Sequence, residues 1–102
     1  MSTNIVARVP EDIAGDIVFF AQQEQVDKST EIRTLLAQAM QEKRKSYALL
    51  KYQQREVTLA KAAKIARVPV AEMLRLTVIN KIPLHYTEKD LREDFAAVFE
   101  RK

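Results

Sequence analysis

Residues 3–10, Thr-Asn-Ile-Val-Ala-Arg-Val-Pro, read as a short strand at the start of a chain that otherwise favours helices. The alternation places Ile5, Ala7 and Val9 on one face and Asn4, Val6 and Arg8 on the other. A lone strand leaves its backbone N–H and C=O groups without partners, so we expect it to pair with the same strand of a second copy. The sequence therefore predicts a homodimer with a two-stranded ribbon, which fits the width of a DNA major groove.

Composition limits the class of protein. A chain of 102 residues allows one or two very small domains, and a single Gly with few aromatic residues favours helices over a large β fold. The absence of Cys excludes disulfides and thiolate metal sites. No apolar run approaches the roughly 20 residues that span a bilayer, and no signal peptide is recognisable. We therefore expect a cytoplasmic protein with no membrane contact.

Charge divides the chain. Residues 1–42 hold three Lys and Arg against seven Asp and Glu, whereas residues 43–102 hold fourteen against seven. The basic excess begins at the run Lys43-Arg44-Lys45. We predict a domain of residues 1–43 and a helical domain of residues 44–102. A basic surface suits an anionic partner, although charge runs are also common on merely solvated faces.

Helical periodicity follows the strand. An apolar face at i, i+4, i+7 and i+8 predicts a helix after Pro10. Asp27 is a candidate N-cap for a second helix that runs unbroken to Tyr52, and Ser29 is the alternative N-cap. Thr58 is a candidate N-cap for a third helix, and Pro69 suits the first turn of a fourth. Asn80 is a candidate left-handed stop. A capping box and an apolar face predict a last helix, on Thr87, Asp90, Leu91, Phe95, Val98 and Phe99.

The order strand, helix, short turn, helix over residues 3–42 resembles the ribbon-helix-helix family of dimeric DNA-binding regulators. The resemblance rests on Ile5 to Asp12, on Ile13, Ile17 and Ala21, and on Val26 to Ser29 leading to Ile32 and Arg33. It implies a mainly α fold and a dimer that binds double-stranded DNA. The implied base contacts are Asn4, Val6 and Arg8, and the implied phosphate contacts are Lys28, Ser29 and Thr30.

Chemistry agrees with this assignment. Arg bonds bidentately to guanine, Asn bonds to adenine, and Val packs on a thymine methyl group. The alternatives are that the strand serves only dimerisation and that Lys28 is a solvated surface residue.

The C-terminal part resembles a second family of small, helical prokaryotic proteins that are linked to toxin–antitoxin systems. The resemblance covers roughly residues 47–97 and rests on Leu50 to Tyr52, Val57 to Ala63, Ile82-Pro83, Tyr86 and Asp90-Leu91. That family often has Gly near two positions that are Gln54 and Arg67 here. The resemblance implies a protein toxin as a partner.

The helices on either side of Arg67 to Pro69 also suggest a helix-turn-helix. Because the second of them offers few polar side chains, a packed core helix used for partner binding or oligomerisation is the preferred interpretation. His85 is the only His, no catalytic triad or metal-ligand cluster can be assembled around it, and no Gly-rich phosphate loop exists. We therefore expect no enzyme activity, no metal and no cofactor.

The leading hypothesis is a homodimeric, sequence-specific DNA-binding transcriptional regulator, a repressor built as a ribbon-helix-helix dimer with a helical, helix-turn-helix-like extension. Higher oligomers are left open. The main alternative is an antitoxin whose C-terminal half binds a protein toxin and which also represses its own operon. A third interpretation is a purely structural oligomer.

Overall fold

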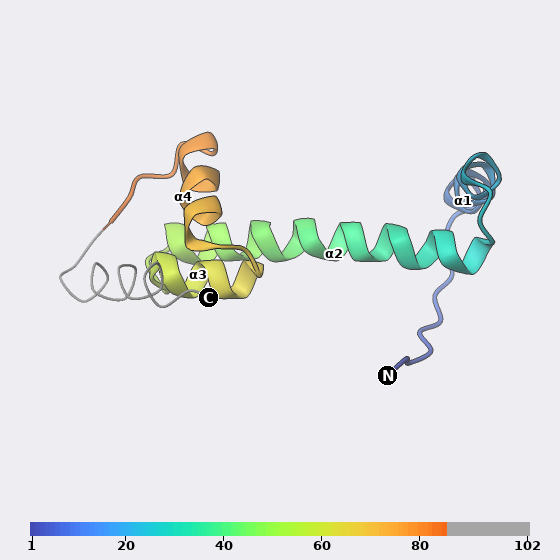
Figure 1. Cartoon of the computed structure of the whole chain (residues 1–102), viewed down its shortest axis with the longest axis horizontal. Helices are drawn as coiled ribbons and strands as arrows, with labels where there is room; N and C mark the ends of the chain where they lie inside the picture. The colour runs from blue at the N-terminus through green and yellow to red at the C-terminus, as the bar shows by residue number, and fades with distance from the viewer. Residues whose placement is uncertain (86–102) are drawn as a thin grey trace. The chain divides into compact units, whose positions relative to one another are not determined.

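The computed structural model describes residues 1–85, which form four helices and no strand (Figure 1). These are α1 (Glu11–Glu24), α2 (Lys28–Gln53), α3 (Leu59–Ala66) and α4 (Val70–Ile79). The chain divides into an N-terminal unit, residues 1–38, and a C-terminal unit, residues 39–102. The prediction of a mainly α protein is confirmed. The helix predicted around Leu91 and Phe95 lies outside the described residues.

The predicted strand is wrong. Residues 1–10 carry no strand, and Ile5 and Val6 are 84% and 93% exposed. An alternating pattern makes a strand only where a second backbone supplies the ladder hydrogen bonds, and no segment of residues 1–85 does so. The ribbon-helix-helix fold, with its ribbon across a dimer axis, is therefore corrected to an all-helical arrangement.

The ends of α1 and α2 follow from local chemistry. Pro10 precedes α1, whose first turn carries Glu11 and Asp12, and negative charge there suits the helix dipole. Gln25 ends α1 in the left-handed conformation, with φ of 57°. The Asp27 Oδ1 atom accepts the Thr30 backbone N–H at 2.9 Å, so the predicted N-cap is confirmed. The unbroken course of α2 past Lys43 is also confirmed.

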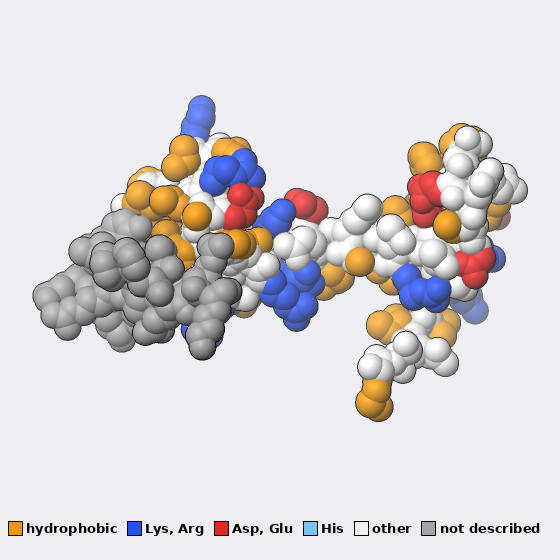
Figure 2. Space-filling model, viewed as in Figure 1, with side chains coloured by type: hydrophobic (Ala, Val, Ile, Leu, Met, Phe, Trp, Pro, Cys, Tyr) orange, Lys and Arg blue, Asp and Glu red, His pale blue; other side chains and the backbone are white. Residues whose placement is uncertain are grey.

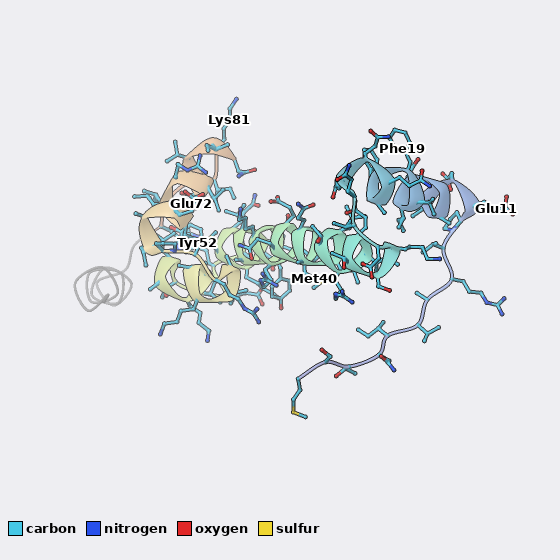
Figure 3. The ribbon with its side chains drawn as sticks, turned by 45° about the vertical axis from the view of Figure 1, so that its right-hand side comes forward. Glu11, Phe19, Met40, Tyr52, Glu72 and Lys81 are labelled. Carbon is cyan, nitrogen blue, oxygen red and sulfur yellow. The ribbon has the colours of Figure 1, made fainter. Side chains whose placement is uncertain are left out.

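The core of the C-terminal unit is built from small side chains around one large ring. Tyr52 of α2, labelled in Figure 3, is fully buried. Met73 of α4 is fully buried as well. The Tyr52 ring stacks on His85 at 4.1 Å between centroids, and its hydroxyl accepts the His85 backbone N–H at 3.1 Å. Alanines bring the helices close together: Ala48 of α2 and Ala62, Ala63 and Ala66 of α3 are buried. These contacts hold α3 and α4 against the second half of α2.

A short turn joins α3 to α4. Thr58 caps α3 as predicted, because its Oγ1 accepts the Lys61 N–H at 3.1 Å. Arg67 ends α3 with φ of 58°, and the next residue, Val68, donates its N–H back to the Ala63 carbonyl at 3.0 Å. This left-handed position explains why Gly is common at the corresponding place in the resembling family.

The predicted left-handed stop at Asn80 is wrong. Its φ is −88°, and the left-handed residue is Lys81, with φ of 56°. The Asn80 side chain donates to the Leu76 carbonyl at 2.7 Å, so it satisfies the helix end without leaving negative φ.

Candidate nucleic-acid interface

The three residues assigned to base contact lie in the segment before α1. Asn4, Val6 and Arg8 are all exposed, and none of their side chains makes a hydrogen bond or ion pair within residues 1–85. The structure therefore gives them no fixed common surface. The described residues contain no ribbon that could carry these side chains into a groove. Their assignment to base contact stays a prediction.

The three residues assigned to phosphate contact lie at the start of α2. Lys28 and Ser29 are exposed, and Thr30 is half-buried. Asp27 already places a carboxylate at this helix end, and hydrogen bonds from the Thr30 side chain and backbone lower the pKa of Asp27. The Thr30 Oγ1 also accepts from Arg33 Nη2 at 3.2 Å. A phosphate bound here would lie next to the Asp27 carboxylate, which already caps this helix end. The assignment of Lys28, Ser29 and Thr30 to phosphate contact stays a prediction.

The charge of the described C-terminal unit is strongly positive. Residues 39–85 hold ten Lys and Arg against three Glu, a formal charge of +7. Residues 1–38 hold three against six, a formal charge of −3. Lys and Arg side chains gather where the middle of α2 meets the end of α3 (Figure 2). The field of these charges favours anions near residues 39–85 over residues 1–38.

The three carboxylates of residues 39–85 are all engaged in local ion pairs. The pairs are Lys45–Glu42 at 3.7 Å, Lys51–Glu56 at 3.2 Å and Arg75–Glu72 at 2.6 Å. The Arg75 guanidinium lowers the pKa of Glu72 and holds it ionised. The other seven cations of this range have no carboxylate partner among the described residues.

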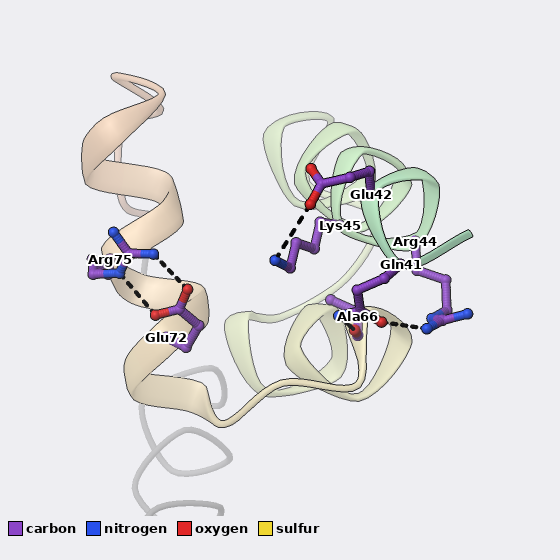
Figure 4. A network of polar contacts seen from close by, with 7 residues as sticks. All are labelled: Gln41, Glu42, Arg44, Lys45, Ala66, Glu72 and Arg75. Carbon is purple, nitrogen blue, oxygen red and sulfur yellow. Dashed lines mark hydrogen bonds and ion pairs between the residues drawn. The ribbon is translucent and has the colours of Figure 1, made fainter. Parts of the chain in front are cut away.

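Four of these cations form what we call the basic face: Arg44, Lys61, Lys64 and Arg67. Buried alanines line the side of α3 that packs against the core. Lys61 and Lys64 are three residues apart and therefore share the exposed side of the helix. The Gln41 Nε2 atom of α2 donates to the Ala66 carbonyl at 3.2 Å, and Arg44 Nη2 donates to Gln41 Oε1 (Figure 4). Arg44 therefore lies beside the end of α3.

Helix α4 has a different surface. Met73 and Thr77 are buried, whereas Leu74, Val78 and Ile79 are 37%, 66% and 57% exposed. Its one cation, Arg75, is bound to Glu72 through two hydrogen bonds of 2.8 and 2.6 Å (Figure 4). The predicted core helix thus packs one side and leaves the other apolar and uncovered within residues 1–85.

Sequence reasoning missed the basic face. It noted the charge run around Arg44 but not Lys61, Lys64 and Arg67. The available signal was the spacing of Lys61 and Lys64 between alanines, because small apolar residues on one side of a short helix point the Lys residues outward.

Two kinds of feature are absent from the described residues. No group of three or more His, Cys, Asp and Glu side chains in residues 1–85 is placed to hold a metal ion. No helix in the same part of the chain combines the length and hydrophobicity needed to cross a bilayer.

Comparison with known families gives a match that covers residues 1–100. The chain belongs to the uncharacterised protein family UPF0175. No curated protein and no solved structure matches it. The match to UPF0175 covers both units, including residues 3–42, which resemble the ribbon-helix-helix family. The match is consistent with the predicted membership of a family of small helical proteins.

Proposed function

We propose that this UPF0175 protein is a regulator that binds double-stranded DNA through its C-terminal unit, with the basic face on the phosphate backbone. The observation that carries the proposal is the charge of +7 over residues 39–85, with Lys61, Lys64 and Arg67 exposed and without carboxylate partners among the described residues. Phosphate contacts from such cations supply most nonspecific affinity for DNA.

The arrangement of α3 and α4 supports the proposal. The two helices contact each other and are joined by the three residues Arg67, Val68 and Pro69. In helix-turn-helix proteins the first helix crosses the phosphate backbone. Here the first helix of the pair is α3, and its exposed side carries Lys61 and Lys64. A phosphate role for α3 therefore needs no rearrangement of the core.

Salt dependence of DNA binding tests the proposal. The probes are a duplex from the gene's own promoter and a scrambled duplex of equal length. The variant Lys61→Gln/Lys64→Gln should weaken binding to both duplexes. It should also reduce the slope of log affinity against log salt by about two, because each of the two cations neutralises one phosphate. Both side chains are exposed, so the fold should be unchanged.

The matched control removes two cations from the other unit. Lys28→Gln/Arg33→Gln changes the net charge equally but leaves the basic face intact. It should leave the salt slope near the wild-type value. A reduced slope in this control, with no reduction in the α3 variant, would place the phosphate contacts in the N-terminal unit and overturn the proposal.

A second candidate function is binding of a partner protein, as an antitoxin binds its toxin. The observation that favours it is the exposed apolar side of α4, with Leu74, Val78 and Ile79. Uncovered apolar side chains in a row are typical of protein interfaces rather than of DNA contact. Both functions can reside in one chain because the basic face and the α4 side chains are different residues.

Co-purification with the product of a neighbouring toxin-like reading frame tests the second function. Val78→Asp should abolish complex formation, because it places a charge in an apolar contact, and should leave the DNA salt slope unchanged. Lys64→Gln is the control and should retain the complex. A complex that survives Val78→Asp would exclude α4 as the contact.

A further inference from the structure

The N-terminal unit leaves almost all its apolar side chains uncovered. Within residues 1–38, Ala21 and Glu31 are the only buried residues among those described. The large apolar residues that are between 36% and 53% exposed are Val9, Ile13, Val18, Phe19, Phe20, Val26, Ile32, Leu35 and Leu36. A unit of this size with one buried apolar residue cannot offset the conformational entropy of ordering two helical segments. Something else must cover these side chains in the stable protein.

We call these nine residues the apolar face; all of them belong to α1, to α2 or to the segments that directly precede these helices. A groove of about 170 Å³ in the same unit is lined by Val9, Ala14, Ile17, Val18, Lys28 and Ile32. Five of these six are apolar, so the groove can receive a large apolar side chain.

The N-terminal unit also holds a buried carboxyl with one unpartnered oxygen. Glu31 is 2% exposed, and its Oε1 atom has no hydrogen-bond partner among the described residues. Buried polar atoms without partners are rare in complete interiors. The unsatisfied Glu31 oxygen and the uncovered side chains lie in the same 38 residues.

We infer that the apolar face is covered by the same face of a second copy of this chain. Nine side chains of this size, each about half exposed, offer on the order of 800 Å² of surface, which is what one partner contributes to a standard stable interface. A two-fold pairing brings identical apolar faces together and needs no other partner.

The inference goes beyond the proposed DNA contact, since it concerns other residues and is tested without DNA. Sedimentation equilibrium of the full chain over a range of micromolar concentrations should give a dimer. Leu36→Glu should raise the dimer dissociation constant at least about 100-fold, because it places a charge within the proposed apolar contact. Leu36 is 53% exposed in the single chain, so the variant should keep its helical circular dichroism.

Val78→Glu is the matched control, because Val78 is equally apolar, 66% exposed and in the C-terminal unit. It should leave the dimer dissociation constant unchanged. A wild-type chain that is monomeric at every concentration would overturn the inference. A dimer that is weakened by Val78→Glu and not by Leu36→Glu would overturn it as well, by assigning the contact to α4.

Cross-linking gives a readout that does not depend on a destabilising charge. The chain has no Cys, so Leu36→Cys introduces a single thiol. Oxidation should yield a covalent dimer for Leu36→Cys and monomer for Val78→Cys. The reverse pattern, or capture of a different protein by Leu36→Cys with no self-linked dimer, would exclude the second copy as the occupant of the apolar face.

Discussion

The two units of this chain place similar apolar residues to opposite effect. In the C-terminal unit, Tyr52, Leu59 and Met73 are buried among alanines. In the N-terminal unit, Ile13, Phe20 and Leu36 stay about half exposed. The charges differ as well, at +7 for residues 39–85 and −3 for residues 1–38. The comparison teaches that an apolar pattern at helical spacing does not by itself say whether its residues pack within one chain or between chains.

The largest expected effect breaks the interior of the C-terminal unit. Tyr52→Ala removes a fully buried ring that stacks on His85 and should cost about 3–5 kcal/mol of unfolding free energy. Leu36→Ala, measured at a concentration where the chain is monomeric, should cost only about 0.5 kcal/mol, because that side chain is half exposed. Urea unfolding followed by circular dichroism compares the two. Equal losses would show that the N-terminal unit has an interior of its own.

Tyr52→Phe separates the ring from its hydroxyl. It keeps the stacking surface and removes the acceptor for the His85 backbone N–H, so it should cost about 1 kcal/mol of unfolding free energy. The same urea series measures it. A decrease as large as that of Tyr52→Ala would mean that the hydroxyl, not the ring, holds residues 81–85 against α2.

An intermediate effect is expected at the start of α3. Thr58→Ala removes the side-chain acceptor of the Lys61 N–H and should cost about 1 kcal/mol. Thr58→Ser keeps an equivalent hydroxyl and should restore most of this stability. Thermal unfolding of the two variants measures the difference. A neutral Thr58→Ala would show that core packing alone positions α3 and, with it, Lys61.

The smallest expected effects are changes in stability with pH, and they arise from two carboxyl groups of the N-terminal unit, Glu31 and Asp27, whose pKa values shift in opposite directions. A hydrogen bond with Glu24 and then burial raise the pKa of Glu31 above 4.5, so the folded state holds this proton more tightly than the unfolded state. The stability from the protonated carboxyl is present at low pH and is lost as pH rises through the raised pKa. Glu31→Gln should therefore raise the melting temperature at neutral pH. Glu42→Gln, at an exposed site, should leave it unchanged.

The pKa of Asp27 is lowered below 3.8, so its contribution is present at neutral pH and is lost as pH falls through the lowered value. Asp27→Asn should remove this acid-side decrease in stability while keeping a capping oxygen. Melting temperatures across an acidic pH series measure it. If the melting temperature of Asp27→Asn falls at acidic pH as much as that of the wild type, other carboxyl groups cause the fall.

Helix boundaries were largely predictable because their causes are local. Pro10, Asp27 and Thr58 act on the backbone within a few residues, and the structure has them where the sequence predicted. The two failures have different causes: the strand lacks a distant partner, whereas the helix end is settled by a local side-chain hydrogen bond that the sequence pattern did not predict. The alternation around Val6 has no second backbone to pair with among residues 1–85, and Asn80 satisfies the helix end with its side chain, so the left-handed turn falls on Lys81.

The helical class, the caps and the division of charge follow from the sequence alone, since these depend on residue type and near neighbours along the chain. Which cations of α3 are exposed follows instead from the packing of the helices. Packing of α3 through Ala62 and Ala66 turns Lys61 and Lys64 outward. The exposure of a side chain depends on which side of its helix meets the core, and that is fixed by contacts between segments distant in sequence.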